Sequence, residues 1–299
     1  MENRQLEEKG AFFEEQRGRL GRIAYGVLGS SSEAEDVVQD AYVRFELTGE
    51  EQLKSREAWL TTVVTRLAID RLRSASHRRE VYPGTWLPEP VVEVRNQEES
   101  QVERSELTLG LLFVLERLRP VERAVFLLRE SFETSYRDIA QIVERPEAAC
   151  RQIYLRARER VQRESGQDSY DFAGKEAMVE RYATAIFEGD EQKLIDAVTE
   201  DVILFSDGGG KIAANINPIY GAKKMVRFIK GVLRKFPFDK LEHHPAIVNG
   251  EPGLLVLRNG KLDSVLAFRF DRNRISAIYN VRNPDKLTGI DLNCESAGF

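Results

Sequence analysis

The sequence predicts a multidomain protein in which two all-α parts are followed by an α+β domain. Up to about residue 165, apolar residues recur at helical spacing. The segment 81–101, rich in proline, interrupts this pattern. After about residue 170, helices give way to strand-like runs separated by turns such as Asn259-Gly260. At 299 residues the chain can hold two or three modules, each burying its own core.

The composition indicates a soluble, cytoplasmic protein. Charged residues make up 31% and apolar residues 42%, and we find no apolar run near the roughly 18 residues that a membrane helix needs. The acidic N-terminus lacks the apolar segment of a secretory signal. Cys150 and Cys294 lie far apart, which fits a reducing compartment better than a disulfide scaffold. No Cys/His spacing indicates zinc, so we expect neither metal nor cofactor.

The net charge of −5 argues against an ordinary basic nucleic-acid binder. Arginines nevertheless concentrate in two segments, with five in 66–80 and five in 147–163. Because local patches set phosphate affinity, nucleic-acid binding remains open.

The first predicted domain, 1–80, contains helices over 11–28 and 33–47, the second with Ser32 as N-cap in a capping box with Glu35. The polar face of this second helix is either a solvated face or a docking surface for a partner helix.

A third helix, over 55–79, has a stripe for burial at positions 60, 63, 64, 67 and 68. Its other face carries an indole and two guanidiniums, as a surface for unstacked bases requires; the residues are Trp59, Thr62, Arg66, Asp70 and Arg73. Alternatively, Asp70 pairs with Arg66 and Arg73 and the face is only structural.

The segment 81–101 is predicted to be a Pro-rich acidic linker. Trp86 and Leu87 are exposed apolar anchors unless something covers them. The linker is either a flexible tether or docks through Trp86, and a lone Trp in such a segment favours docking.

The second helical domain, 102–166, begins with helices over 102–116 and 121–130. A short helix over 136–143, capped by Ser135 with Asp138, and a longer one from Pro146 to about 163 are joined by a tight turn, which is a helix-turn-helix. Cys150 lies on the inward stripe and is expected in the core. Arg151, Gln152 and Arg156 point outward, where Arg and Gln can read guanine and adenine edges; the alternative is a hairpin with solvated arginines.

The third domain, 170–290, precedes a tail at 291–299. Its pattern predicts helices and then antiparallel strands, hence an α+β domain; the helices are 172–187, 191–198 and 222–236, and the strands 202–206, 246–249, 253–257, 262–270 and 275–281. The loop 207–211, DGGGK, is no Walker motif and reads as a tight turn beside a pocket mouth. Asp207 and Asn215 could line that pocket, although no catalytic pair can be assigned.

Together these segments resemble the extracytoplasmic-function sigma factors that carry a fused SnoaL-like C-terminal domain. The resemblance lies in EDVVQDAYVRF (35–45), AWLTTVVTRLAIDRLR (58–73), YRDIAQIVERPEAACRQIYLRARER (136–160), WLPEP (86–90), DGGGK (207–211) and NPDKL (283–287). Many such factors have Asn where this chain has Arg66, so promoter preference does not carry over at that position.

The resemblance implies two partners, the RNA polymerase core, met through its β' coiled coil and β flap, and promoter DNA. It implies polymerase contacts at Asp36, Gln39, Asp40 and Arg44, and minus-ten contacts at Lys54, Arg56, Trp59, Thr62, Arg66 and Arg73. It implies minus-thirty-five contacts at Arg145, Arg151, Gln152 and Arg156. Interdomain regulatory contacts are expected at Trp86, Leu87, Pro88, Glu89, Pro90, Asp207, Gly208, Gly209, Gly210, Lys211, Asn283, Pro284 and Asp285.

On this hypothesis the protein is a non-enzymatic promoter-recognition subunit regulated in cis by its C-terminal domain. A ligand-sensing helix-turn-helix regulator and a SnoaL-type enzyme with a regulatory helical part remain as alternatives. A duplex-only regulator has no need of the aromatic and basic face on helix 55–79. The sequence leaves open whether the C-terminal domain binds a small molecule, and whether it activates or inhibits.

Overall fold

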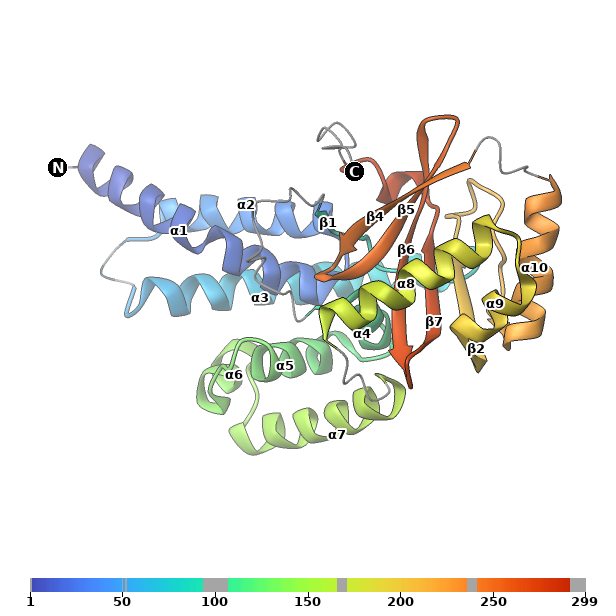
Figure 1. The fold of residues 1–299 in the computed structure, drawn as a ribbon. Helices are drawn as coiled ribbons and strands as arrows, with labels where there is room; N and C mark the ends of the chain where they lie inside the picture. The colour runs from blue at the N-terminus through green and yellow to red at the C-terminus, as the bar shows by residue number, and fades with distance from the viewer. Residues whose placement is uncertain are drawn as a thin grey trace. The chain divides into compact units, whose positions relative to one another are not determined.

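The computed structural model describes residues 2–49, 51, 53–93, 107–165, 171–235 and 241–290. The chain forms two compact units, one of residues 1–80 with 114–164 and one of residues 81–113 with 165–299 (Figure 1). The predicted fold class, two all-α parts followed by an α+β domain, is confirmed. Within the described ranges, no helix is long and apolar enough to cross a membrane.

The first unit is built from α-helices. They are α1 (Glu2–Leu28), α2 (Ser31–Leu47), α3 (Arg56–Glu80), α5 (Pro120–Glu130), α6 (Tyr136–Val143) and α7 (Glu147–Ser165). The N-cap expected at Ser32 is wrong: Ser30 caps α2, its hydroxyl accepting from the Glu33 N–H at 3.2 Å. Gly29, at a φ of 67°, ends α1 and reverses the chain at once, so α2 begins earlier than the Ser-rich run suggested.

The predicted cores of the helical parts are present. Of the predicted stripe on α3, Leu60, Val64 and Ala68 are fully buried, whereas Val63 and Leu67 are half-buried. In the helix-turn-helix, the Ser135 hydroxyl accepts from the Asp138 N–H at 3.1 Å, and Glu144 turns the chain with a φ of 53°. Cys150 is buried, as predicted, and burial raises the pKa of its thiol.

Arg123 of α5 connects the two segments of the first unit, residues 1–80 and 114–164. It is fully buried, and its Nε donates to the Gly26 carbonyl of α1 at 2.9 Å. Its Nη1 pairs with Glu116. Because an arginine without these partners would be a buried unpaired charge, the packing of α5 on α1 is specific rather than generically apolar.

In its described residues, the second unit is a seven-stranded sheet with helices. It comprises β1 (Val92–Glu93), α4 (Leu109–Leu115, of which residues to Phe113 belong to this unit), α8 (Phe172–Phe187), α9 (Glu191–Ala197), β2 (Val198–Asp207), β3 (Ile219–Tyr220), α10 (Ala222–Lys235), β4 (Leu241–Val248), β5 (Glu251–Arg258), β6 (Lys261–Asp271), β7 (Arg274–Val281) and the 3₁₀-helix η3 (Pro284–Lys286). The strand order is β1-β4-β5-β6-β7-β2-β3.

Two expectations for this unit are corrected. The strands are not all antiparallel, because β2 pairs with β7 in parallel, Phe205 opposite Tyr279. The crossover through α10 carries the chain from β2 to β4, and the β4–β7 meander then returns beside β2. Helix 102–116 begins only at Leu109: residues 102–106 lie outside the described part, and Leu107 is buried but outside the helix, its carbonyl accepting from the Asn249 amide at 3.2 Å.

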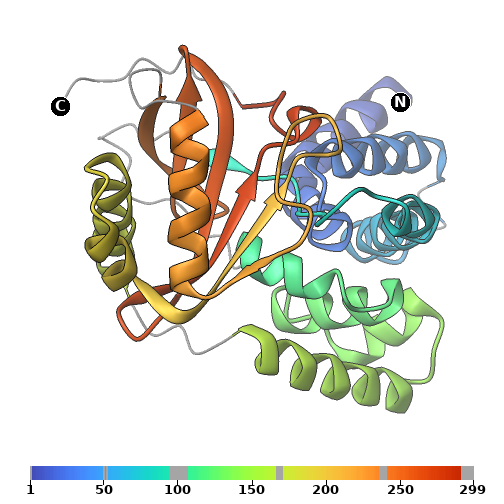
Figure 2. The same ribbon diagram turned by 90° about the vertical axis from the view of Figure 1, so that its right-hand side faces the viewer.

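The sheet is covered on both faces. One face packs on α8, α9 and α10 through residues such as Tyr182, Met225 and Phe268, and Figure 2 shows α10, in orange, lying along the sheet. The other face receives Leu87 from the linker and Leu109 from α4. Leu87 is fully buried. The linker is therefore part of the core of the C-terminal unit.

Candidate functional site

Asp207, the last residue of β2, is the centre of a buried cluster that fixes the linker. Its carboxylate is fully buried and accepts hydrogen bonds from the Tyr82 hydroxyl at 2.5 Å and the Leu87 N–H at 2.9 Å. It also accepts from the Gly209 N–H at 3.0 Å and pairs with the Lys286 ammonium at 2.7 Å. We call Tyr82, Trp86, Leu87, Asp207 and Lys286 the Asp207 cluster.

Lys286, from η3, completes the cluster with a cation. Its Nζ lies 3.9 Å from the centre of the Trp86 ring and 5.3 Å from that of Tyr82, and it donates to the Leu87 carbonyl. A partly desolvated cation over an indole is a favourable contact. Burial, with the hydrogen bond to Asp207, raises the pKa of Tyr82, which therefore stays a donor.

The glycines after Asp207 allow the linker and tail to approach. Gly209 and Gly210 have φ values of 63° and 70°. A Cβ on Gly210 would stand 2.6 Å from Cγ of Pro83, and one on Gly209 2.5 Å from the Asn283 amide carbon. The DGGGK loop thus meets the linker on one side and the NPDKL segment on the other.

The remaining residues of these three segments surround the cluster. Pro88 and Pro90 are buried and Glu89 is half-buried. Asn283 caps η3, and its amide donates to the Tyr82 hydroxyl at 2.9 Å. The ammonium of Lys211 pairs with Asp285 at 2.6 Å.

Sequence reasoning missed Tyr82, Pro83 and Lys286 as site residues. Lys286 lies inside the quoted NPDKL segment, and Tyr82 lies four residues before Trp86. The sequence also predicted that Asp207 and Asn215 could line a pocket beside the DGGGK loop. Asn215 does line the pocket, but Asp207 is absent from the lining because its carboxylate faces the linker.

In the first unit, Arg66 of α3 binds the end of α6. Its Nε donates to the Ile142 carbonyl at 2.9 Å and its Nη2 to the Gln141 carbonyl at 2.8 Å. The same Nη2 pairs with Glu144 at 3.0 Å. Asp70 therefore pairs with Arg73, at 2.9 Å, and not with Arg66 as the alternative interpretation of this face had it.

Other members of the predicted minus-ten face lie beside Arg66 on α3 or at its start. Trp59 is half-buried, its ring 5.9 Å from that of Phe45. Arg56 stacks over Phe12 at 5.8 Å, and the Thr62 hydroxyl donates to the Ala58 carbonyl at 2.8 Å. Lys54 is exposed.

The predicted polymerase and minus-thirty-five faces are both exposed to solvent. All of the predicted contact residues on these faces are exposed: Asp36, Gln39, Asp40 and Arg44 on α2, and Arg145, Arg151, Gln152 and Arg156 at or on α7. On α2, Val43 and Leu47 are 55% and 83% exposed beside the polar residues. Arg151 pairs with Glu147 and lies 4.4 Å from the Tyr136 ring centre.

Among the described residues, no cluster of three or more His, Cys, Asp or Glu side chains could hold a metal ion. An arginine-faced helix, a helix-turn-helix and an accessory α+β domain define the class of helix-turn-helix transcription proteins.

The comparisons with known proteins narrow this class. Residues 12–78 match the family model Sigma-70 region 2, and residues 109–161 match Sigma-70, region 4. The chain is 34% identical to the ECF RNA polymerase sigma factor SigJ of Mycobacterium tuberculosis, over 94% of this chain and 93% of the relative. It is 29% identical to a probable ECF sigma factor, SigI, of the same organism, over 91% and 92%.

A solved structure agrees with these relatives. The crystal structure of Mycobacterium tuberculosis SigJ superposes with a TM-score of 0.77 at 31% identity, covering 94% of this chain and 99% of that one. The chain therefore belongs to the extracytoplasmic-function RNA polymerase sigma factors, which direct the initiation of transcription.

Proposed function

We propose that this sigma factor brings RNA polymerase core to promoters through its helical unit, in the cytoplasm, and is inhibited in cis by its C-terminal domain. The observation that carries the inhibitory part is the Asp207 cluster, which fixes the linker on the C-terminal domain through Tyr82 and Leu87. The polymerase, minus-ten and minus-thirty-five roles of the exposed faces are part of this proposal.

The contact between α3 and α6 supports an inactive arrangement. The minus-ten and minus-thirty-five elements are about 25 base pairs apart, or roughly 85 Å along B-form DNA. Arg66, on the proposed minus-ten helix, lies 2.9 Å from the Ile142 carbonyl of the helix-turn-helix. While this contact persists, α3 and the helix-turn-helix cannot reach both promoter elements, so the helical unit has to open.

The docked linker opposes such opening. Fully extended, residues 81–113 would span roughly 110 Å, enough to connect the two elements. Here the segment is held at Leu87 and again at Leu109, both buried against the same sheet. Docking thus shortens the linker between α3 and the helix-turn-helix, and release of the linker restores its full length.

The same geometry argues against the enzyme alternative at Asp207. A general base needs a carboxylate within reach of a substrate proton. Both oxygens of Asp207 already accept from the linker, one from Tyr82 and the other from Leu87. This use of the carboxylate supports a structural role.

Transcription in vitro with purified core polymerase tests the proposal. On a matched promoter, such as the chain's own upstream region, the full-length chain should give a core-dependent transcript, and a truncation ending at Ser165 should give more. No transcript from either protein would sink the sigma assignment. Equal transcripts from both would sink inhibition in cis.

The minus-thirty-five assignment has its own test. Arg151→Ala should cost about 1–3 kcal/mol of base readout and lower transcription from a matched promoter. An unchanged transcript would remove Arg151 from the reading face.

A further inference from the structure

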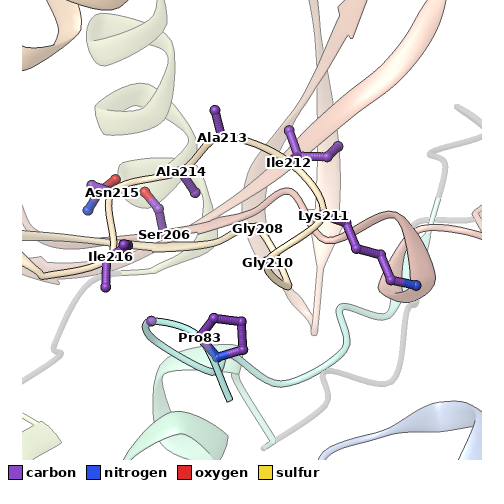
Figure 3. Close-up of a pocket in the computed structure, with 11 residues that line it drawn as sticks. Pro83, Ser206, Gly208, Gly210, Lys211, Ile212, Ala213, Ala214, Asn215 and Ile216 are labelled. Carbon is purple, nitrogen blue, oxygen red and sulfur yellow. The ribbon is translucent and has the colours of Figure 1, made fainter. Parts of the chain in front are cut away.

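A pocket lies where the loop after β2 meets the linker. Figure 3 shows residues 208–216 arching over Pro83, with Ser206 and Asn215 at the same end of the loop. The cavity volume is about 320 Å³, at the small end of the range for ligand pockets. Since a water molecule takes about 30 Å³ of liquid, the space suits a molecule of roughly ten non-hydrogen atoms.

Two polar oxygens in this lining have unused hydrogen-bonding capacity. Ser206 is 2% exposed, and within the described part of the chain neither its hydroxyl nor the Asn215 amide oxygen has a hydrogen-bond partner. The Asn215 amide nitrogen donates to the Asn217 carbonyl at 3.1 Å, which leaves the oxygen as the acceptor. Buried polar groups in native proteins are nearly always paired, so these two call for a partner.

The rest of the lining is apolar or backbone and carries no unbalanced charge. Pro83, Ile212, Ala213, Ala214 and Ile216 supply the apolar atoms. Lys211 is paired with Asp285. In Figure 3 its side chain points away from the hollow above Pro83. A neutral ligand with an apolar body fits such a lining. A carboxylate has no N–H or O–H to donate, so it would leave the Asn215 oxygen without a hydrogen-bond donor.

We infer that this pocket binds a small neutral molecule that presents N–H and C=O side by side, such as a primary amide or a lactam. The N–H donates to the Asn215 oxygen, and the C=O accepts from the Ser206 hydroxyl. This satisfies both buried oxygens at once.

The linker supplies one side of the pocket, which couples the ligand to regulation; this step rests on the proposed function. Pro83 and Gly84 line the cavity. A Cβ on Gly84 would stand 3.3 Å from Cα of Ile216, so the linker is closely apposed to the loop there. A molecule that contacts both sides binds the docked state more tightly, and by linkage it stabilises docking. The ligand therefore favours the inhibited state.

Benzamide is a probe of the right size and chemistry, and acetophenone and benzoate match its shape without the N–H donor. With the full-length chain, ligand-observed NMR titration should give a Kd of about 1 mM for benzamide and at least fivefold weaker binding for the other two. Ser206→Ala should weaken benzamide at least fivefold. Ser276→Ala, a matched change on β7 outside the lining, should not. Equal binding of the three probes, no benzamide binding, or no effect of Ser206→Ala would overturn the ligand class.

Hydrogen exchange of the linker tests the coupling. At ten times its Kd, benzamide should slow exchange of residues 81–93 by roughly tenfold, the factor 1 + [L]/Kd for a ligand that binds only the docked state. Binding without any slowing would refute the coupling. If these residues exchange as fast as an unfolded chain even without benzamide, linker docking and the proposed inhibition in cis fail, while the NMR titration still decides the pocket chemistry.

Discussion

Replacing Asp207 by Asn should release the linker from the C-terminal domain. The carboxylate is fully buried and receives the Tyr82 hydroxyl, the Leu87 N–H and the Lys286 ammonium. An Asn side chain keeps one acceptor but places an NH₂ where the second oxygen stood. The Lys286 side chain, 11% exposed, then loses its counter-charge.

The magnitude follows from the linker's own contacts. Removing one partner of a buried ion pair costs about 3–5 kcal/mol, and this loss is shared between the domain and the docked linker. Of the linker's two hydrogen bonds to the carboxylate, one is lost, at a cost of about 1.5–3 kcal/mol, and the other becomes neutral, which costs about 1 kcal/mol more. Docking should therefore weaken by about 3 kcal/mol or more, which is over a hundredfold in the docking equilibrium.

Hydrogen exchange of residues 81–93 measures this change, and in vitro transcription shows its consequence. Asp207→Asn should accelerate linker exchange by over a hundredfold where exchange proceeds through undocking, and raise the transcript yield toward that of the truncation. Asp263→Asn is the matched control. Its carboxylate, 15% exposed, pairs with Arg258 at 3.0 Å and Arg282 at 2.9 Å, and within the described part of the chain it has no linker residue as an ion-pair or hydrogen-bond partner. Equal acceleration in both variants, or none in Asp207→Asn, would refute the reasoning.

Three further predictions concern the closed arrangement. Arg66→Ala removes the contacts to α6, so it should weaken the packing of α6 on α3 by about 1–2 kcal/mol and speed hydrogen exchange of the α6 amides. Arg73→Ala, which removes only the pair with Asp70, should leave that exchange unchanged. Equal exchange in both variants would contradict the Arg66 contact. Gly210→Ala should loosen the linker more than Gly260→Ala does, because both have positive φ but only the first Cβ meets Pro83; limited proteolysis of the linker compares them, and equal cleavage would argue against the clash. The raised pKa of Tyr82 in the docked state means that the undocked tyrosine loses its proton first as pH rises, so docking is fully stable below about pH 10 and weakens above it. Hydrogen exchange of the linker measured across pH 10 should show this weakening in the native chain and not in Tyr82→Phe.

Much of the fold was predictable because local rules dominate it. Helix spacing and the Ser135 cap fixed the helix-turn-helix to the residue at both ends of α6. The start of α2 was wrong because three consecutive serines offer equivalent caps, and the chain reversal at Gly29 decides among them. The parallel pairing of β2 with β7 depends on a long-range return that no local pattern encodes.

The site was predictable as segments but not as contacts. The three quoted segments do contain Trp86, Asp207 and Lys286, yet their meeting in one cluster involves residues far apart in sequence. Tyr82 has no local pattern that marks it as a partner of Asp207. Likewise, nothing in α3 shows that Arg66 binds backbone carbonyls of α6, since carbonyls carry no sequence identity.

The exposed face of α2 and the bound Arg66 of α3 suggest an order in which polymerase binding precedes opening of the helical unit. The α2 face proposed for polymerase, with Asp36, Asp40 and the neighbouring Leu47, is solvent-accessible in the closed helical unit. Arg66, on the helix proposed to read the minus-ten element, is instead bound to α6. Polymerase can therefore be met without prior opening, whereas reading both promoter elements requires it. Because a partner shifts an equilibrium only by its differential affinity, core polymerase has to bind the open state more tightly than the closed one to activate the chain.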